Sequence, residues 1–531
     1  MTLAGRAATF ALVLFVEKIL LSPLVDSHKV DTAQGWDAWA RLAQHFGLRF
    51  LVSFAIVVAY FTYAHGSAVL SGINVEARGI GVRGRLLALH VVLLFPIAVT
   101  LSYLFGGQRV ELPFPLVAAF AVTLMAVSVA ALLAGLAPWA LWRRAASEMG
   151  SRWMYAAVGA VIGTAAIVWS QHLWIPTARL TFELVRLLLE PIIPNLQTEA
   201  ATRIIRAPHF AVSVSRVCSG LEGIGLMAAF TCTWLICLRT QYRFPQALLL
   251  IPTGVLVAFT LNVARIAALV LIGNSGHPIV AVYGFHSQAG WIAFNCAACG
   301  VAAVSQRISW VSRRPERSER GSESNPTAAY LMPFLAILAA GMVSRAASGH
   351  FETWFALRLL VGAIMLARYL PRWSALDWRF GWRAIAVGAA AFGLWVGAAH
   401  FILAPRSMPT ALTAMSGSER ALWIIGRAAT AIIIQPLAEE IAYRGYLLRR
   451  LVAADFEAVP FRECGRVALL VSALAFGVIH GALWLPATAV GILYGALVIR
   501  TGRMGEAVAA HATANTLLTA WVLLGYQWQL W

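Results

Sequence analysis

The sequence predicts an all-α, polytopic transmembrane protein with about fifteen spans arranged in two helical-bundle domains. Of its 531 residues, 60% are hydrophobic and only 12% are charged, whereas soluble domains carry about a quarter charged residues. Apolar runs of the length that crosses a bilayer, about 20 residues, recur along the whole chain. The basic residues are concentrated in the short connections between these runs, as is typical of multi-pass membrane proteins.

Each apolar run is interpreted as one membrane-spanning helix. The runs before position 306 lie near 7–25, 47–70, 85–106, 114–142, 153–175, 219–239, 245–273 and 287–305. Those after position 327 lie near 328–344, 352–370, 384–404, 420–443, 466–481, 484–500 and 504–524.

The segment 307–327, RISWVSRRPERSERGSESNPT, divides the two sets of spans. It is rich in charge, serine and proline, so it cannot pack as a helix in lipid. We therefore expect a first membrane domain at 1–306, a linker at 307–327 and a second membrane domain at 328–531.

The distribution of arginine predicts the topology of the first domain. Every even-numbered span is followed by basic residues, such as Arg78 and Arg83 after the second span and Arg143 and Arg144 after the fourth. The positive-inside rule then assigns the N-terminus and the linker to the cytoplasm. The long connection 176–217 falls outside, and its alternation of apolar and charged positions predicts an amphipathic helix in the outer interface.

The net charge of +18 would indicate nucleic-acid binding in a soluble protein. Here the topology and the attraction of anionic lipid headgroups account for it, so we expect membrane lipids and no nucleic acid as partners. The six cysteines form no disulfide framework, and Cys296 and Cys299 lack the second ligand pair that a metal site would need.

Three reactive side chains are predicted to lie at one depth of the membrane. Cys218 begins the sixth span at the outer face, Arg265 lies in the outer half of the seventh, and His286 begins the eighth. A thiolate is a nucleophile that a nearby imidazole can generate, and a guanidinium can stabilise an oxyanion. Each residue alone also has a structural interpretation: cysteine packs, histidine lies at the interface, and Arg265 pairs with a carbonyl or with Glu222.

The stretches CSGLEGIG, NVARIAALVLIG and FHSQAGW, in this order, resemble the three motifs of the exosortase/archaeosortase family. The resemblance covers roughly residues 150–305 and implies catalytic roles for Cys218, Arg265 and His286. It also implies a transpeptidase whose partners are exported proteins with a C-terminal sorting signal, which consists of a short motif, a transmembrane helix and a basic tail. Such an enzyme cleaves through a thioester, transfers the protein to an acceptor, and faces the periplasm or exterior of a bacterial inner membrane.

A second constellation lies in the C-terminal domain, in PLAEEIAYRGYLLRR, FGVIHG and HATANT. Glu440 and Arg444 have the i, i+4 spacing of a helical ion pair, which leaves Glu439 for chemistry. A buried carboxylate can act as a general base toward water, and histidine can share the proton. His511 and Asn515, also i, i+4, can stabilise an oxyanion. The alternative is a polar network that only holds helices together.

EExxxR, FxxxH and HxxxN resemble the CAAX-protease and bacteriocin-processing (CPBP) family of intramembrane proteases. The resemblance implies that Glu439 and His480 activate water, that His511 and Asn515 stabilise the oxyanion, and that Glu440 and Arg444 support them. We expect no cofactor, although zinc at Glu439, His480 and His511 remains an alternative because two histidines and one glutamate form a catalytic zinc set.

Two such domains in one chain resemble the exosortase E/protease fusion, which is associated with VPEID-type sorting signals. The predicted helix directions put His480 near the outer end of its span and Glu439 toward the inner end, so one helix must extend further or break at Pro436. Two other functions remain open: a transporter or export permease without peptidase activity, and a processing protease without transfer.

Overall fold

The computed structural model describes residues 80–105, 113–215, 218–313 and 325–531, together with scattered residues before position 80. The predicted span 47–70 lies outside the described residues, and most of 7–25 does too. The chain forms two compact units, Met1–Leu173 and Trp174–Trp531. The boundary between these units falls elsewhere than the predicted linker, so the domain division at 307–327 stays a prediction.

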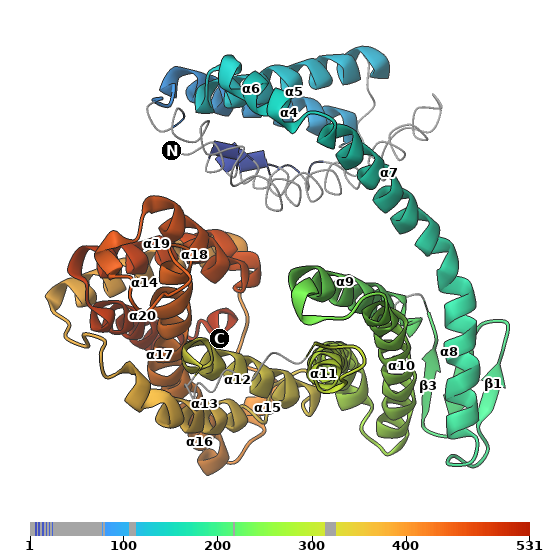
Figure 1. The fold of residues 1–531 in the computed structure, drawn as a ribbon. Helices are drawn as coiled ribbons and strands as arrows, with labels where there is room; N and C mark the ends of the chain where they lie inside the picture. Colours follow the sequence, from blue (N-terminus) through green and yellow to red (C-terminus); the bar gives the residue numbers. More distant parts are fainter. Residues whose placement is uncertain are drawn as a thin grey trace. The chain divides into compact units, whose positions relative to one another are not determined.

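The first unit consists of helices, and α4 packs along α5 (Figure 1). Its elements are α4 (Gly84–Phe105), α5 (Phe114–Leu136), α6 (Trp139–Met149), α7 (Arg152–Ser170) and η5 (Gln171–Leu173). The predicted span 114–142 is shorter in the structure because Pro138 follows the extended residue Ala137 and ends α5.

The second unit begins with a segment of one helix and one small sheet, and the all-α prediction did not include the sheet. The segment consists of α8 (Trp174–Leu189) and an antiparallel three-stranded sheet of order β1 (Gln197–Glu199), β2 (Ile204–Ala207) and β3 (Phe210–Ser213). Ile205, which pairs with Thr198 and Val212, is fully buried in the core beneath the sheet. The predicted amphipathic helix is therefore present as α8, and a small sheet follows it.

Three helices follow the sheet, and α10 packs against both of the others. They are α9 (Leu221–Cys237), α10 (Leu250–Asn274) and α11 (His286–Arg307), the last preceded by the π-helical turn η9 (Val280–Phe285). Phe210 of β3 rests on α10 at Gly273, where a Cβ would lie 2.3 Å from its ring. This contact ties the sheet to the helix that carries Arg265.

Residues 325–531 form a helical bundle in which α14, α19 and α20 pack side by side and α18 covers α19 (Figure 1). Its α-helical and π-helical elements are α12 (Pro326–Ala346), α13 (Ala356–Tyr369), α14 (Trp382–Ile402), α15 (Thr410–Thr413), α16 (Gly417–Ala429), η11 (Thr430–Ile434), α17 (Gln435–Glu440), η12 (Ile441–Leu448), α18 (Arg466–Val478), α19 (Trp484–Thr501) and α20 (Met504–Gly525). Buried aromatic side chains such as Tyr330, Tyr443, Phe476 and Tyr494 fill its core.

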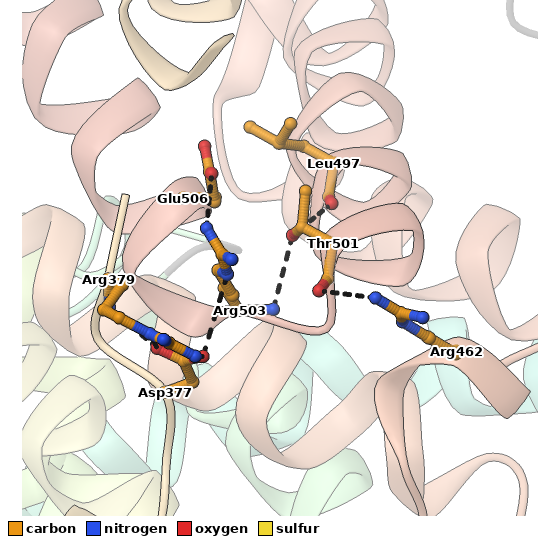
Figure 2. Close-up of polar contacts among 7 residues, drawn as sticks. All are labelled: Asp377, Arg379, Arg462, Leu497, Thr501, Arg503 and Glu506. Carbon is orange, nitrogen blue, oxygen red and sulfur yellow. Dashed lines mark hydrogen bonds and ion pairs between the residues drawn. The ribbon is translucent and has the colours of Figure 1, made fainter. Parts of the chain in front are cut away.

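Polar side chains tie the connections together at one end of this bundle (Figure 2). Asp377 accepts hydrogen bonds from Arg379 and lies 3.7 Å from Nε of Arg503. Arg462 donates to the carbonyl of Thr501 over 3.2 Å. The loop before α14, the loop before α18 and the α19–α20 turn are thus joined by charged contacts.

Within the described part of the chain, nine helices are long and apolar enough to cross a membrane. The protein is therefore a polytopic all-α membrane protein, as the sequence predicts. Three of the predicted spans form helices shorter than a full crossing: α9, α13 and α18 have 17, 14 and 13 residues. The number of about fifteen spans stays a prediction.

Candidate active sites

The loop that carries Cys218 is held between two helices. Nδ2 of Asn262, on α10, donates a hydrogen bond to the carbonyl oxygen of Cys218 over 3.1 Å. Thr181 Oγ1, on α8, donates to the carbonyl oxygen of Ser219 over 3.1 Å. Cys218 is buried, at 6% exposure. Side-chain donors on two helices therefore hold the backbone of the loop that presents the thiol.

Gly220 is required by this arrangement. Its φ of +82° lies in the left-handed region, and a Cβ there would come within 2.7 Å of the Asn262 side-chain nitrogen. Asn262 stands three positions before Arg265, so both side chains project from one face of α10. Asn262 was not among the residues singled out from the sequence, although this spacing from Arg265 is a signal that could have identified it.

The structure brings Arg265 and His286 together. Nη2 of Arg265 lies 3.4 Å from Nδ1 of His286, and the guanidinium can only donate. In this arrangement Nδ1 of the ring accepts, so the ring proton resides on Nε2. A Cβ at Gly290 would lie 3.0 Å from Nη1 of Arg265, and the small residue therefore lets the guanidinium lie against α11.

Arg265 and His286 line a cavity of about 270 Å³, together with Glu222, Asn262 and Gly220. The Arg265 guanidinium is close enough to the Cys218 thiol and the Glu222 carboxylate to interact with both electrostatically. Its Nε is buried, and no described residue accepts a hydrogen bond from it. This cavity therefore combines an imidazole with a guanidinium that has unused hydrogen-bonding capacity. The Cys218 thiol does not line the cavity, and its loop reaches the cavity wall at Gly220.

The two glutamates of the second constellation lie on one long helix, 417–448, that contains two π-helical segments. The π-helical segments η11 and η12 flank the α-helical turn α17, which carries Glu439 and Glu440. Pro436, at the start of α17, has no N–H to donate to the preceding turn, and a π-helical turn accommodates such a gap without a break. Of the two predicted alternatives, a helix that extends further or one that breaks, the structure has a continuous helix with altered pitch at Pro436.

Glu440 is the centre of a fully buried network. Its Oε1 accepts from Nη1 of Arg444 at 3.0 Å and from Nδ1 of His511 at 2.9 Å. Nη2 of Arg444 donates to the carbonyl oxygen of Gly491, on α19, over 2.9 Å. The i, i+4 pairing of Glu440 with Arg444 follows the spacing in the sequence, and the network joins α17, α19 and α20.

Glu439 is also buried but makes fewer contacts. Its Oε1 accepts from Nε2 of Gln435 at 2.8 Å. Its Oε2 lies 3.9 Å from Nε2 of His511 and has no hydrogen-bond partner among the described residues. Because His511 uses Nδ1 for Glu440, its Nε2 faces Glu439. Gln435 was missed in the sequence, although it stands four positions before Glu439.

His480 and Asn515 face the same cavity, of about 140 Å³, as Gln435 and His511. Nδ1 of His480 lies 2.8 Å from the carbonyl oxygen of Phe476, which can only accept, so Nε2 carries the free lone pair. Asn515 donates to the carbonyl of Ala431 over 2.7 Å. His480 lies just beyond the end of α18 and lines the same cavity as Gln435 of α17, whereas Glu439 does not line it.

No three His, Cys, Asp or Glu side chains converge as metal ligands in the ranges that the structure describes. Glu439, His480 and His511, the residues of the zinc alternative, share a region without forming such a group. His511 directs Nδ1 to Glu440 and Nε2 to Glu439. This geometry is that of a hydrogen-bonded carboxylate and imidazole network.

The described spans belong to a polytopic membrane protein in which two clusters of polar side chains line cavities between helices. The family model of the transmembrane exosortase (EpsH type) matches residues 36–303, half of the chain. The model of the type II CAAX prenyl endopeptidase Rce1-like family matches residues 421–517. No curated protein and no solved structure matches the chain. The protein belongs to the transmembrane exosortase family and carries an Rce1-like protease region in the same chain, and both families imply peptidase activity.

Proposed function

We propose that the chain is a bifunctional membrane peptidase: a cysteine transpeptidase whose site contains Cys218, and a glutamate-dependent endopeptidase whose site contains Glu439. The substrates of the first site are exported proteins with a C-terminal sorting signal of the kind the family resemblance implies. The observation that carries this proposal is the cavity that Arg265 and His286 share beside the Cys218 loop.

The first reaction proceeds through a thioester. The Cys218 thiolate attacks the carbonyl carbon that follows the sorting motif, and the Arg265 guanidinium stabilises the oxyanion. His286, which takes the proton of the Cys218 thiol as the thiolate forms, gives that proton to the leaving amine as the C–N bond breaks, and the protein remains attached to Cys218. A nucleophilic group of the acceptor attacks the thioester, loses its proton to His286 and releases the thiol.

The second reaction is hydrolysis. Glu439, with His480, takes a proton from water, and the resulting hydroxide attacks the peptide carbonyl. His511 and Asn515 stabilise the oxyanion, and the proton passes to the leaving amine. The contacts of the Glu439 carboxylate support this assignment, because its Oε1 accepts from Gln435 while its Oε2 has no hydrogen-bond partner among the described residues and lies 3.9 Å from Nε2 of His511. Glu440 and Arg444 hold His511 in position.

The location we propose is a bacterial inner membrane, with the N-terminus and linker in the cytoplasm and the Cys218 site facing the periplasm. The concentration of arginine in the even-numbered connections supports this orientation. The connections after residue 325 follow the same rule. Arg449, Arg450 and Arg462 lie in the connection before α18. Arg500 and Arg503 lie at the connection between α19 and α20, which we place on the same side of the membrane.

The test is co-expression of the full chain with a tagged substrate that ends in a sorting motif, a transmembrane helix and a basic tail. Cys218→Ala should abolish release of the tail and transfer to the acceptor, whereas Cys232→Ala, a cysteine outside the cavity, should not. Glu439→Ala should remove the second activity. Glu506→Gln, which removes a buried carboxylate on a different helix, α20, should retain it. Tail processing by Cys218→Ala would refute the transpeptidase, and loss of only the Glu439-dependent step to chelators would favour zinc.

A further inference from the structure

Arg427 is a partly buried cation that lines the cavity of the Glu439 site. Its guanidinium rests on two rings, with the carbon Cζ 4.6 Å from the ring centre of Phe355 and 5.6 Å from that of Trp531. None of the described residues accepts a hydrogen bond from this side chain or forms an ion pair with it. Ring contacts stabilise the charge but leave all five N–H donors of the guanidinium without an acceptor.

The nearest acidic side chain does not neutralise Arg427. Glu352 and Arg358 both interact with it electrostatically, but Glu352 accepts two hydrogen bonds from Arg358, at 2.8 and 2.6 Å. This bidentate pair occupies both carboxylate oxygens. The three side chains together therefore carry one uncompensated positive charge, which belongs to Arg427.

The position of Arg427 connects this charge to the glutamate. Arg427, Ala431, Gln435 and Glu439 are spaced by four residues along one helix, so they form a stripe on one face. The first three line the cavity, and the small Ala431 leaves room between the two polar ends. A cation thus lies at one end of the cavity and the Glu439 carboxylate near the other.

We infer that Arg427 binds a carboxylate of the peptide that the Glu439 site cleaves. A carboxylate matches the fork of a guanidinium with two parallel hydrogen bonds and compensates a partly buried charge that is otherwise costly within a membrane domain. This inference rests on the proposed endopeptidase function. The carboxylate belongs either to the C-terminus of the peptide or to an acidic side chain, and both sources share the same chemistry.

The spacing limits where this carboxylate lies in the peptide. Twelve positions of helix correspond to at most about 18 Å between Arg427 and Glu439. An extended peptide rises about 3.3 Å per residue. The carboxylate of the bound peptide therefore lies within about five residues of the scissile bond.

The experiment measures binding rather than cleavage. The full chain with Glu439→Gln, in nanodiscs, is titrated with three dansyl-labelled hexapeptides of leucine and alanine: one with a free C-terminus, its amide, and the amide with one glutamate. Energy transfer from the cavity tryptophans to dansyl reports binding. We expect at least one carboxylate-bearing probe to bind about ten- to a hundredfold more tightly than the neutral amide, and the two carboxylate arms distinguish the two sources.

Variants at position 427 test the assignment. Arg427→Gln should remove the preference for carboxylate, and Arg427→Lys, which keeps the charge, should retain part of it. Arg383→Gln, at an exposed position outside the cavity, is the matched control and should leave the preference unchanged. Equal affinity for all three probes, or absence of binding, overturns the inference, as does a preference that persists in Arg427→Gln. If the wild-type chain cleaves peptides with and without a carboxylate at the same rate, and this cleavage requires Glu439, the endopeptidase function is retained and only the carboxylate site at Arg427 is refuted.

Discussion

The two sites each contain an arginine, fully buried at Arg444 and partly buried at Arg265, and the two side chains are used in opposite ways. Arg444 donates to Glu440 and to the carbonyl of Gly491 and is only 1% exposed. Arg265 makes one 3.4 Å contact with His286, and its Nε has no acceptor among the described residues. A buried arginine whose hydrogen bonds all go to the protein holds helices together. An arginine beside a cavity that keeps a donor free can bind a substrate.

The largest expected effect is on stability, at Arg444. Arg444→Met leaves Glu440 as an uncompensated buried charge, which costs about 3–5 kcal/mol. Thermal unfolding of the purified protein in nanodiscs should show a large decrease in Tm, partly recovered in the double variant Glu440→Gln/Arg444→Met. Arg466→Met, which removes an exposed arginine at the start of α18, should leave Tm nearly unchanged. A Tm equal to wild type in Arg444→Met would mean that the Glu440 network does not stabilise the bundle.

At Arg265 the expected effect is on rate. Arg265→Gln should lower the transfer rate about 10²–10³-fold, as does removal of an oxyanion donor, while Tm changes little because few bonds are lost. Kinetics of tail release and thermal unfolding on the same preparations separate the two effects. Arg239→Gln, at an exposed position after α9, should match wild type. A fall in Tm with no loss of rate would assign Arg265 the same structural role as Arg444.

Substitution of Gly220 tests whether the geometry of the Cys218 loop is needed for transfer. Gly220→Ala should destabilise the unit by about 1–2 kcal/mol because of its positive φ and should also displace Asn262, which slows transfer. Gly225→Ala is the matched control, since a Cβ there meets nothing within 4 Å and the residue does not line the cavity. In the double variant Gly220→Ala/Asn262→Ala the contact disappears and the strain of φ remains. Activity of Gly220→Ala equal to wild type would separate the loop geometry from catalysis.

The smallest effect concerns Asp377, outside both sites. Hydrogen bonds from Arg379 lower the pKa of the Asp377 carboxyl from 3.8 to about 2. A lowered pKa stabilises the folded state above pH 4, and this contribution is lost as the pH falls toward 2. Asp377→Asn should therefore lower Tm slightly at pH 6, with the difference from wild type narrowing between pH 4 and pH 2 and in high salt. A pH-independent difference would rule out the charge as its cause.

The fold could be predicted from the sequence where hydropathy alone decides the structure. Helices such as α10, α19 and α20 begin and end within a few residues of the predicted spans because apolar length specifies them. The sheet could not be predicted, because its strands have three or four residues each and lie in a long polar connection. Their pairing depends on tertiary contacts, such as that of Phe210 with α10.

The site could be predicted only in part, for a similar reason. Arg265 and His286 share a cavity, and Glu440 pairs with Arg444, as spacing and topology indicate. Asn262, Gln435 and Arg427 were missed because each is one polar residue in an apolar helix. Their roles depend on what faces them: the Cys218 carbonyl, the Glu439 carboxylate and the shared cavity. The π-helical segments around α17 also leave no sign in hydropathy.

The central claim is that Cys218 and Glu439 serve two separate reactions. The most direct test is to quench the reaction of the full chain with a tagged sorting substrate and to locate the covalent intermediate by mass spectrometry. The account predicts a hydroxylamine-sensitive thioester on Cys218, present in wild type and in Glu439→Gln and absent in Cys218→Ala. An adduct that persists in Cys218→Ala, or that requires Glu439, would contradict it.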